Sequence, residues 1–239
     1  MKRALVTGGS GGIGSAICRR LAADGLHVIV HANRNLASAQ SLCQELKDKG
    51  GSAQAVQFDV ADHDATRSAL EALLEDGAIQ VLVNNAGIHD DAVFPGMQPE
   101  QWHRVIDVSL HGFFNVTQPL SMPMIRSRWG RIISISSIAG ITGNRGQTNY
   151  AAAKGALHAA SKSLALELAT RGITVNAVAP GIISSEMSKG VFDANAIAHL
   201  VPMKRAGTPE EVAMLVGFLA SDDAAYITGQ VISINGGMV

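Results

Sequence analysis

The stretch Thr7-Gly8-Gly9-Ser10-Gly11-Gly12-Ile13-Gly14 decides the fold of this chain. A short apolar run precedes it, and a helical pattern follows at once. Glycines allow the backbone to turn sharply and to approach a pyrophosphate closely. The N–H groups and the dipole at the start of the following helix favour the same anion. A glycine-rich turn alone is weak evidence, but this one lies between a first strand and a first helix and therefore predicts a dinucleotide-binding turn.

Outward from this turn, short β-branched runs alternate with longer amphipathic stretches. Several runs are continuously apolar, which is typical of parallel strands buried on both faces. The repeated alternation predicts an α/β fold with a doubly wound sheet. The predicted strands are Ala4–Thr7, Val28–His31, Ala55–Phe58, Val81–Val83, Arg131–Ile135, Thr174–Ala177 and Val231–Ile234. The predicted helices include Gly12–Asp24, Ala37–Lys49, Asp64–Glu75 and Tyr150–Thr170.

The 239 residues show no internal repeat, no low-complexity segment and no linker rich in Pro, Gly or Ser. One domain over residues 1–239 is therefore expected. The alternation of strands and helices breaks between about Ser184 and Pro209, so we expect an irregular insertion there that covers a substrate as a lid.

The balance of charges excludes several classes of partner. Lys and Arg number 19 and Asp and Glu 20, so the net charge of -1 offers no general field for nucleic acid or an anionic membrane. No apolar run is long enough to span a bilayer, and the N-terminus lacks the pattern of a signal peptide. Cys18 and Cys43 form no C-x-x-C pair, which suits buried thiols in a reducing cytoplasm. The eight histidines form no metal-ligand motif.

The second predicted strand ends in Val30-His31-Ala32-Asn33-Arg34. An acidic residue at such a strand end would accept a hydrogen bond from the ribose 2′-hydroxyl of NAD, and none is present. Arg34 instead offers a cation with planar donors that suit a 2′-phosphate. The sequence therefore favours NADP(H) over NAD(H). The alternative is that Arg34 is a solvated loop residue.

Further motifs follow the glycine turn in order along the chain. They are Asp59-Val60, Asn84-Asn85-Ala86-Gly87, Ser137, Tyr150-Ala151-Ala152-Ala153-Lys154 and Pro180-Gly181. With this set the sequence resembles the short-chain dehydrogenases/reductases over essentially its whole length. Within them it looks most like the 3-oxoacyl-acyl-carrier-protein reductases, through Asn149 to Lys154, Arg171 to Asn176 and the ending from Thr228 to Met238.

The resemblance implies a cofactor role for each matching position. Asp59 would contact the adenine, and the Ile183 backbone and the Ser185 hydroxyl would contact the nicotinamide carboxamide. Ser185 stands where Thr is often found, a mild change because both bear hydroxyls. The complete set of implied contacts is Gly8, Ser10, Gly12, Ile13, Gly14, Asp59, Val60, Asn85, Ala86, Gly87, Tyr150, Lys154, Pro180, Gly181, Ile183 and Ser185.

Tyr150 and Lys154 are four positions apart on a predicted helix, so they share a face. Carbonyl reduction needs a hydride for the carbon and a proton for the oxygen. A phenol near pKa 10 transfers a proton poorly at neutral pH, and we expect the adjacent ammonium to lower the pKa of Tyr150. Ser137, after the fifth predicted strand, would hydrogen-bond the substrate carbonyl. Ser134 and Ser136 are neighbouring alternatives, better explained by strand-end hydrogen bonds.

Ser109 departs from the family pattern. In Val105-Ile106-Asp107-Val108-Ser109-Leu110 it stands where many members carry an Asn that holds a water in a proton relay. A Ser is shorter and has a different set of donors and acceptors. The relay could keep its water in another geometry or be weaker, and the change could equally mark a specialised substrate or reduced turnover. The sequence leaves these alternatives open.

The resemblance also implies strand order 3-2-1-4-5-6-7, a homotetramer, and NADPH-dependent reduction of a 3-oxoacyl thioester carried by an acyl carrier protein, in fatty-acid or polyketide and polyene biosynthesis. Arg128 and Arg171 match basic residues that meet the acidic carrier, although single arginines at helix ends are usually solvated. Two alternatives remain: an alcohol, sugar or acetoacetyl-CoA dehydrogenase with the same core, and a weakly catalytic cofactor-binding subunit.

Overall fold

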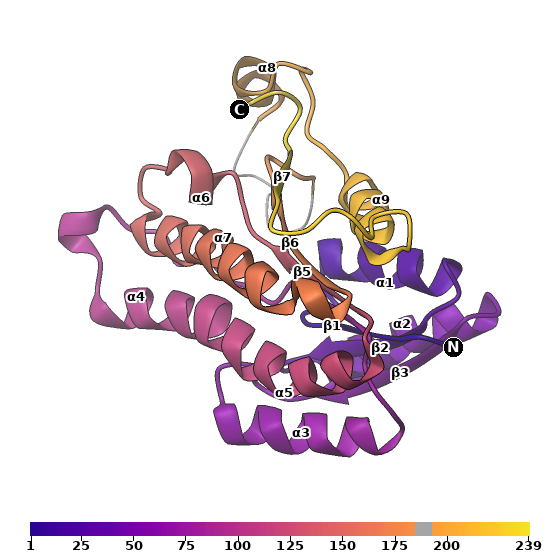
Figure 1. Cartoon of the computed structure of the whole chain (residues 1–239). Coiled ribbons are helices and arrows are strands. Elements are labelled where there is room, and N and C mark those ends of the chain that lie inside the picture. The colour runs from indigo at the N-terminus through magenta and orange to yellow at the C-terminus, as the bar shows by residue number, and fades with distance from the viewer. Residues whose placement is uncertain (185–192) are drawn as a thin grey trace.

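Seven parallel strands form one sheet in the order β3-β2-β1-β4-β5-β6-β7 (Figure 1). The computed structural model describes residues 1–184 and 193–239. Both the doubly wound α/β class and the strand order are confirmed. The strands are β1 Arg3–Val6, β2 His27–Ala32, β3 Ser52–Gln57, β4 Val81–Asn84, β5 Gly130–Ile135, β6 Ile173–Pro180 and β7 Val231–Ile234.

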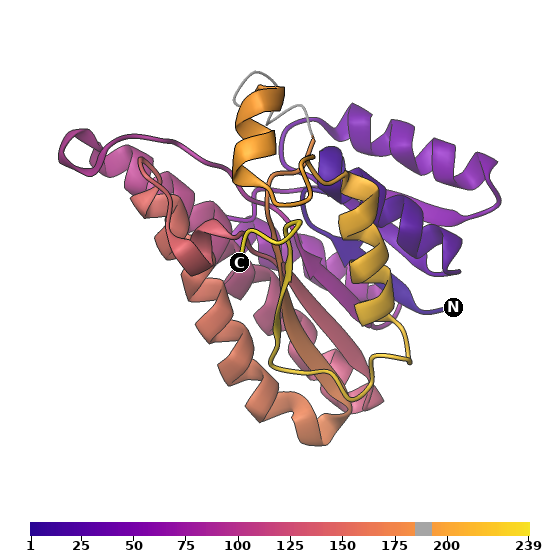
Figure 2. The ribbon, with the colours of Figure 1, turned by 90° about the horizontal axis from the view of Figure 1, so that it is seen from above.

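Helices cover both faces of this sheet. One face packs against α1 (Gly12–Ala23), α2 (Leu36–Asp48) and α9 (Pro209–Ala220). The other packs against α3 (His63–Glu75), α5 (Gly112–Ser127) and α7 (Thr148–Leu168). The turned view in Figure 2 shows these layers from above. The remaining helical segments are η1 Phe94–Gly96, α4 Pro99–Ile106, η2 Asp107–His111, α6 Ala139–Thr142, η3 Ala169–Arg171 and α8 Ala194–Leu200.

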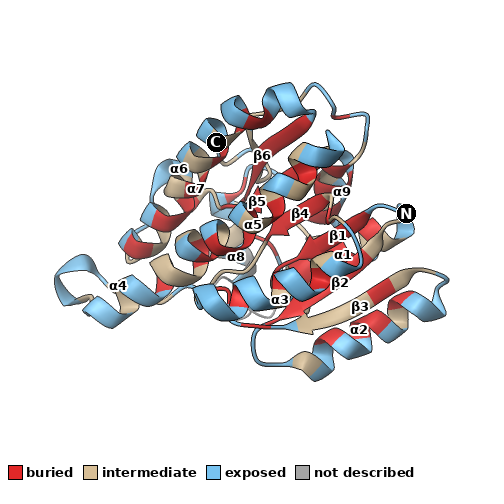
Figure 3. Ribbon diagram, turned by 60° about the horizontal axis from the view of Figure 1, so that its bottom comes forward, coloured by how far each residue is buried: buried red, intermediate tan, exposed pale blue. Residues whose placement is uncertain are grey.

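The central strands are buried on both faces because their side chains alternate between two cores. In β1, Ala4 and Val6 belong to the core under α1, α2 and α9, whereas Leu5 belongs to the core under α3, α5 and α7. Figure 3 shows the central strands in red beneath helices whose outer faces are exposed. This double burial explains the continuous apolar runs in the sequence. Because every pair of neighbouring strands is parallel, the carboxyl ends of all the strands lie at one edge of the sheet.

The structure adds elements that the sequence pattern did not predict. Strand β3 begins three residues before the predicted Ala55. Helix α8 (Ala194–Leu200) lies within the stretch expected to be irregular. A π-helical turn, η2 (Asp107–His111), separates α4 from α5. In the described part of the chain, no helix has the length and apolar character needed to cross a membrane.

Candidate active site

The glycine turn joins β1 to α1 at the carboxyl edge of the sheet. Gly8 has a φ of +62°, a conformation that L side chains rarely adopt. A Cβ on Gly14 would lie only 2.2 Å from the Gly8 carbonyl oxygen, so the turn closes only with glycine there. The N-cap residue Gly11 provides no side-chain hydrogen bond to the first turn of α1. The start of α1 is therefore shaped to receive an anionic group on its backbone N–H groups.

Thr7 and Asn85 tie this turn to the end of β4. The Asn85 amide donates to the carbonyls of Thr7, at 2.9 Å, and Gly8, at 3.1 Å. The Thr7 hydroxyl in return accepts from the backbone N–H groups of Asn85 and Ala86, both at 3.0 Å. These bonds hold the segment Asn85–Gly87 against the glycine turn. The glycine turn and the segment Asn85–Gly87 therefore form a narrow site that is lined by backbone atoms and fixed in position. Such a site fits a dinucleotide.

The ends of β2 and β3 lie beside the turn and carry Arg34, Asp59 and Val60. Arg34 is exposed, and its guanidinium has no hydrogen bond or ion pair within residues 1–184 and 193–239. The Asp59 carboxylate accepts from the backbone N–H of Ala61 at 3.0 Å, whereas Val60 is buried. Among the described residues, Arg34 is thus an unpaired cation at the edge of the site, available to a ligand phosphate.

Ser137, Tyr150 and Lys154 meet at the same edge, between the end of β5 and the first turns of α7. The phenol of Tyr150 is hydrogen-bonded to Ser137. The Lys154 ammonium lies 5.6 Å from the centre of the Tyr150 ring and donates to the Ile135 carbonyl at 2.9 Å. The hydroxyl of Ser136 instead donates to the backbone carbonyl of Lys154. Of the neighbouring serines, Ser137 is therefore the one that faces Tyr150.

The expected lowering of the Tyr150 pKa by Lys154 is wrong for this structure. Burial raises the pKa of Tyr150; the hydrogen bond from Ser137 opposes this shift, and the Asp91 carboxylate adds to it. Lys154 is itself buried, and burial lowers the pKa of its ammonium to about 8. Desolvation is the largest influence on both groups, because Lys154 is buried and Tyr150 is half-buried. The pair therefore holds a protonated phenol at neutral pH.

Ser109 lies in the π-helical turn, with its hydroxyl buried and without a hydrogen-bond partner among the described residues. It borders a small, partly open cavity of about 10 Å³, at the lower limit for one water molecule. Thr7, Asn84 and Ala86 also line this cavity. A Cβ on Gly87 would lie 3.0 Å from the Lys154 nitrogen and 3.8 Å from the Ser109 oxygen. Ser109 and Lys154 thus approach the same glycine.

Pro180 ends β6 and Gly181 follows it, at the same edge of the sheet as Ser137 and Tyr150. The Pro180 carbonyl accepts from the backbone N–H of Ile138 at 2.9 Å, and Gly181 donates to Ile234 at 2.9 Å. Ile183 is buried and pairs with Gly207 in an isolated bridge. The expected contact from Ser185 lies outside the described residues. The end of β6 is thus held beside Ser137 by main-chain bonds.

The model of the short chain dehydrogenase family matches residues 2–196 of this chain. The chain belongs to the short-chain dehydrogenase family. It is 44% identical over 236 residues to the 3-oxoacyl-[acyl-carrier-protein] reductase FabG of Aggregatibacter actinomycetemcomitans, covering 98% of each chain. It is 46% identical over 238 residues to the 3-oxoacyl-[acyl-carrier-protein] reductase of Synechocystis sp., covering 99% of this chain and 96% of that one. Nodulation protein G of Azospirillum brasilense is 43% identical over 240 residues, with 99% and 98% covered.

Two residues of this short-chain dehydrogenase that sequence reasoning missed support the site from beneath. Asn149, fully buried, donates to the carbonyls of Asp90 and Gln101 and accepts from the Tyr150 backbone N–H. Its place directly before Tyr150 was the available signal. His31 is buried under the glycine turn, and its contacts are long-range, so no local pattern could have revealed them.

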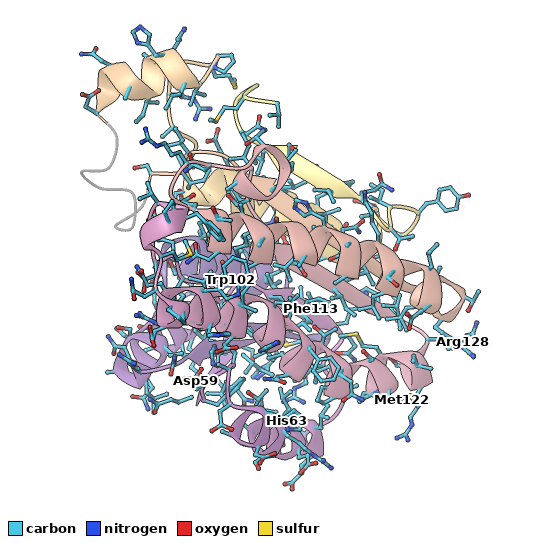
Figure 4. All side chains as sticks on the ribbon, turned by 90° about the vertical axis from the view of Figure 1, so that its left-hand side faces the viewer. Asp59, His63, Trp102, Phe113, Met122 and Arg128 are labelled. Carbon is cyan, nitrogen blue, oxygen red and sulfur yellow. The ribbon has the colours of Figure 1, made fainter. Side chains whose placement is uncertain are left out.

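Arg128 and Arg171 lie far from the candidate catalytic residues of the short-chain dehydrogenase. Arg128 ends α5 just before β5, and Arg171 ends η3 just before β6, so both lie where these strands begin. Figure 4 shows Arg128 at the opposite end of α5 from Trp102 of α4. A strand of the six residues of β5 spans about 20 Å. Among the described residues no cluster of His, Cys, Asp and Glu could hold a metal ion.

Proposed function

We propose that this short-chain dehydrogenase reduces a 3-oxoacyl thioester, carried by an acyl carrier protein, to the 3-hydroxyacyl thioester with NADPH. The single observation that carries the proposal is the hydrogen-bonded pair Ser137 and Tyr150 beside buried Lys154, at the edge where the glycine turn opens. The thioester and its carrier are supported by relatives named 3-oxoacyl-[acyl-carrier-protein] reductase that are 44 to 46% identical over nearly the whole chain.

In this proposal, Ser137 and Tyr150 hold the substrate carbonyl oxygen between two hydroxyl groups. NADPH supplies the hydride that adds to the carbonyl carbon. Tyr150 donates its phenolic proton to the oxygen as negative charge develops there. The raised pKa of Tyr150 keeps that proton in place at neutral pH. The pKa of about 8 keeps the Lys154 ammonium largely protonated at pH 7. Because this charge lies close to Tyr150, it would stabilise the phenolate that remains after the proton is donated.

The cofactor would lie along the carboxyl edge of the sheet. Backbone at Gly8, Ser10, Gly12, Ile13 and Gly14 would hold the pyrophosphate, because the start of α1 lacks a side-chain cap. The adenine end would meet Asp59, Val60 and the unpaired guanidinium of Arg34, which favours the 2′-phosphate of NADP(H). The nicotinamide end would meet Asn85, Ala86, Gly87, Tyr150, Lys154, Pro180, Gly181, Ile183 and Ser185.

Ser109 would act in returning a proton to Tyr150. Its buried hydroxyl has no partner among the described residues and borders a cavity that suits one water molecule. A water there would be a hydrogen-bond partner for the Ser109 hydroxyl. Without a partner, a buried hydroxyl destabilises the fold by the free energy of its desolvation. The Ser109 oxygen, in the π-helical turn, and the Lys154 nitrogen both approach Gly87. We therefore assign Ser109 to a relay that runs through Lys154.

The remaining assignments concern assembly and setting. We propose one domain over residues 1–239, with 184–209 covering the substrate, in a cytoplasmic homotetramer. Exposed apolar side chains on the outer helices, Phe114, Met122 and Leu166, support assembly. Because Arg128 and Arg171 lie at the opposite edge from Tyr150, they would meet a carrier protein that serves the site of another subunit.

The decisive experiment measures NADPH oxidation with an acetoacetyl thioester on carrier protein and on CoA, with Tyr150→Phe as the matched variant. The expected result is turnover that favours the carrier-bound form and falls at least 100-fold in Tyr150→Phe. The variant should still bind NADPH, because most of the cofactor contacts lie elsewhere. Wild-type protein that binds NADPH but turns over neither thioester would refute the proposed substrate. If sugars or simple alcohols are turned over as fast as the thioesters, the alternative of an alcohol or sugar dehydrogenase with the same core would be favoured.

A further inference from the structure

The side chain of His31, on β2, joins three segments beneath the glycine turn. Its imidazole is 1% exposed. The backbone N–H of Gly8 donates to Nδ1 at 3.0 Å, and Nε2 lies 2.9 Å from the carbonyl oxygen of Phe58. The ring also packs on the Phe58 ring, with centroids 4.1 Å apart. These partners fix the tautomer, because Nδ1 must accept a hydrogen bond and Nε2 must donate one.

The bonded form is the neutral imidazole. Protonation would place an N–H on Nδ1 opposite the N–H of Gly8, so that two donors would face each other. Burial lowers the pKa of His31 to about 4, and the neighbouring Asp59 carboxylate opposes this shift. The ring is therefore neutral at physiological pH, as its two hydrogen bonds require.

The three joined segments are those that surround the adenosine end of the proposed cofactor site. Gly8 opens the glycine turn, Arg34 follows His31 by three residues, and Asp59 follows Phe58 directly. The backbone repeats the connection, since the N–H of Gly9 donates to the His31 carbonyl at 2.9 Å. Gly8 itself has a left-handed φ of +62°. The orientation of its N–H group therefore determines the path of the chain from β1 into the turn.

We infer that His31 is a positioning residue for the cofactor: it holds the Gly8 peptide, and through it the pyrophosphate turn, at a fixed distance from the residues that meet the adenosine. The inference rests on the proposed use of a nicotinamide dinucleotide. It does not depend on which carbonyl compound is reduced. Because His31 lies beneath the turn, away from Tyr150, it acts on cofactor affinity and not on the chemical step.

Three variants separate positioning from general packing. His31→Gln keeps one acceptor and one donor on a side chain long enough to reach both partners. His31→Asn keeps the same groups on a chain too short to reach both, and His31→Leu removes them. His27→Leu is the matched control, because His27 lies on the same strand and its ring bonds Ser52 at 2.7 Å, away from the turn.

Each folded variant is titrated with NADPH and with NADH, and kcat is measured at saturating NADPH. For His31→Asn and His31→Leu we expect both dissociation constants to rise at least tenfold in the same proportion, with kcat within twofold of wild type. His31→Gln should recover most of the affinity, and His27→Leu should match wild type. If His31→Leu does not fold, His31→Asn compared with His31→Gln decides.

Unchanged affinity in His31→Asn, or a fall in kcat without a change in affinity, would overturn the inference. The binding titration also separates it from the proposed reaction. Wild-type protein that binds the nucleotides but reduces no 3-oxoacyl thioester would refute that reaction and leave the His31 result intact. Wild-type protein that binds neither nucleotide would overturn both.

Discussion

Replacing Lys154 by methionine is expected to stabilise the folded protein while abolishing turnover. Lys154 is 3% exposed, and burial lowers the pKa of its ammonium from 10.5 to about 8. One pKa unit corresponds to about 1.4 kcal/mol, so holding this charge in the interior costs roughly 3 kcal/mol at neutral pH. Methionine has a similar length without the charge, but it loses the hydrogen bond from the ammonium to the Ile135 carbonyl, and a bond of a charged group is worth roughly 2 kcal/mol. The net gain in the free energy of unfolding is therefore about 1 kcal/mol.

The pH dependence of this gain has a definite sign. Between pH 8 and pH 10.5 the unfolded chain keeps a proton on Lys154 that the folded protein has released, so the wild type becomes more stable as pH rises through this window. Below pH 8 the cost is present in full. The advantage of Lys154→Met should therefore be largest near pH 7 and should fall by roughly 3 kcal/mol by pH 10.5.

Urea unfolding at pH 7 and at several alkaline pH values measures this difference. The protein concentration is held fixed and no nucleotide is added, because association and ligands both shift apparent stability. Lys162→Met is the control, since Lys162 lies exposed on the same helix, α7. An advantage of Lys154→Met that is the same at every pH would refute the reasoning, as would a wild type that is more stable than the variant at pH 7.

Three further substitutions test other parts of the site. Gly14→Ala should abolish NADPH binding in a titration, since its Cβ would lie 2.2 Å from the Gly8 carbonyl oxygen; near-normal affinity in a folded variant would contradict this. Arg34→Ala should weaken NADPH by about tenfold, or 1.4 kcal/mol, and leave NADH unchanged; equal losses for both would remove Arg34 from the 2′-phosphate. Ser109→Ala should lower kcat by about tenfold, because the hydroxyl proposed to hold the relay water is removed. Steady-state assays on the folded variant check this effect, and an unchanged kcat would exclude the relay.

The parts of the site that sequence could predict depend on local spacing. The glycine turn follows from residue types that tolerate a sharp turn, and the shared face of Tyr150 and Lys154 follows from helical geometry. The strand order came from the resemblance to a family, and the structure confirms it. Element boundaries shifted by up to three residues, as at β3, because helix and strand ends depend on tertiary contacts.

The parts that sequence could not predict depend on contacts between distant segments. The Lys154 ammonium donates a hydrogen bond to the Ile135 carbonyl, 19 positions away. The pKa of Tyr150 is raised by burial, whereas the sequence led us to expect that Lys154 would lower it. Neither fact is visible in the spacing of Tyr150 and Lys154. The π-helical turn around Ser109 has no signature in the amino-acid composition. One extra residue in a single helical turn leaves the apolar periodicity of the segment unchanged.

The strand order also determines when the candidate site can form during synthesis. Strand β1 pairs with β4, whose Val81 lies opposite Ala4, and the site is complete only when β6 has paired with β5. An emerging chain that ends before Ile173 contains the glycine turn, Tyr150 and Lys154, but it lacks the strand that carries Pro180 to the same edge. A ligand that binds only the completed edge stabilises only chains that have reached this stage. Nucleotide availability would then influence how many newly made chains complete folding, in addition to how fast the finished protein works.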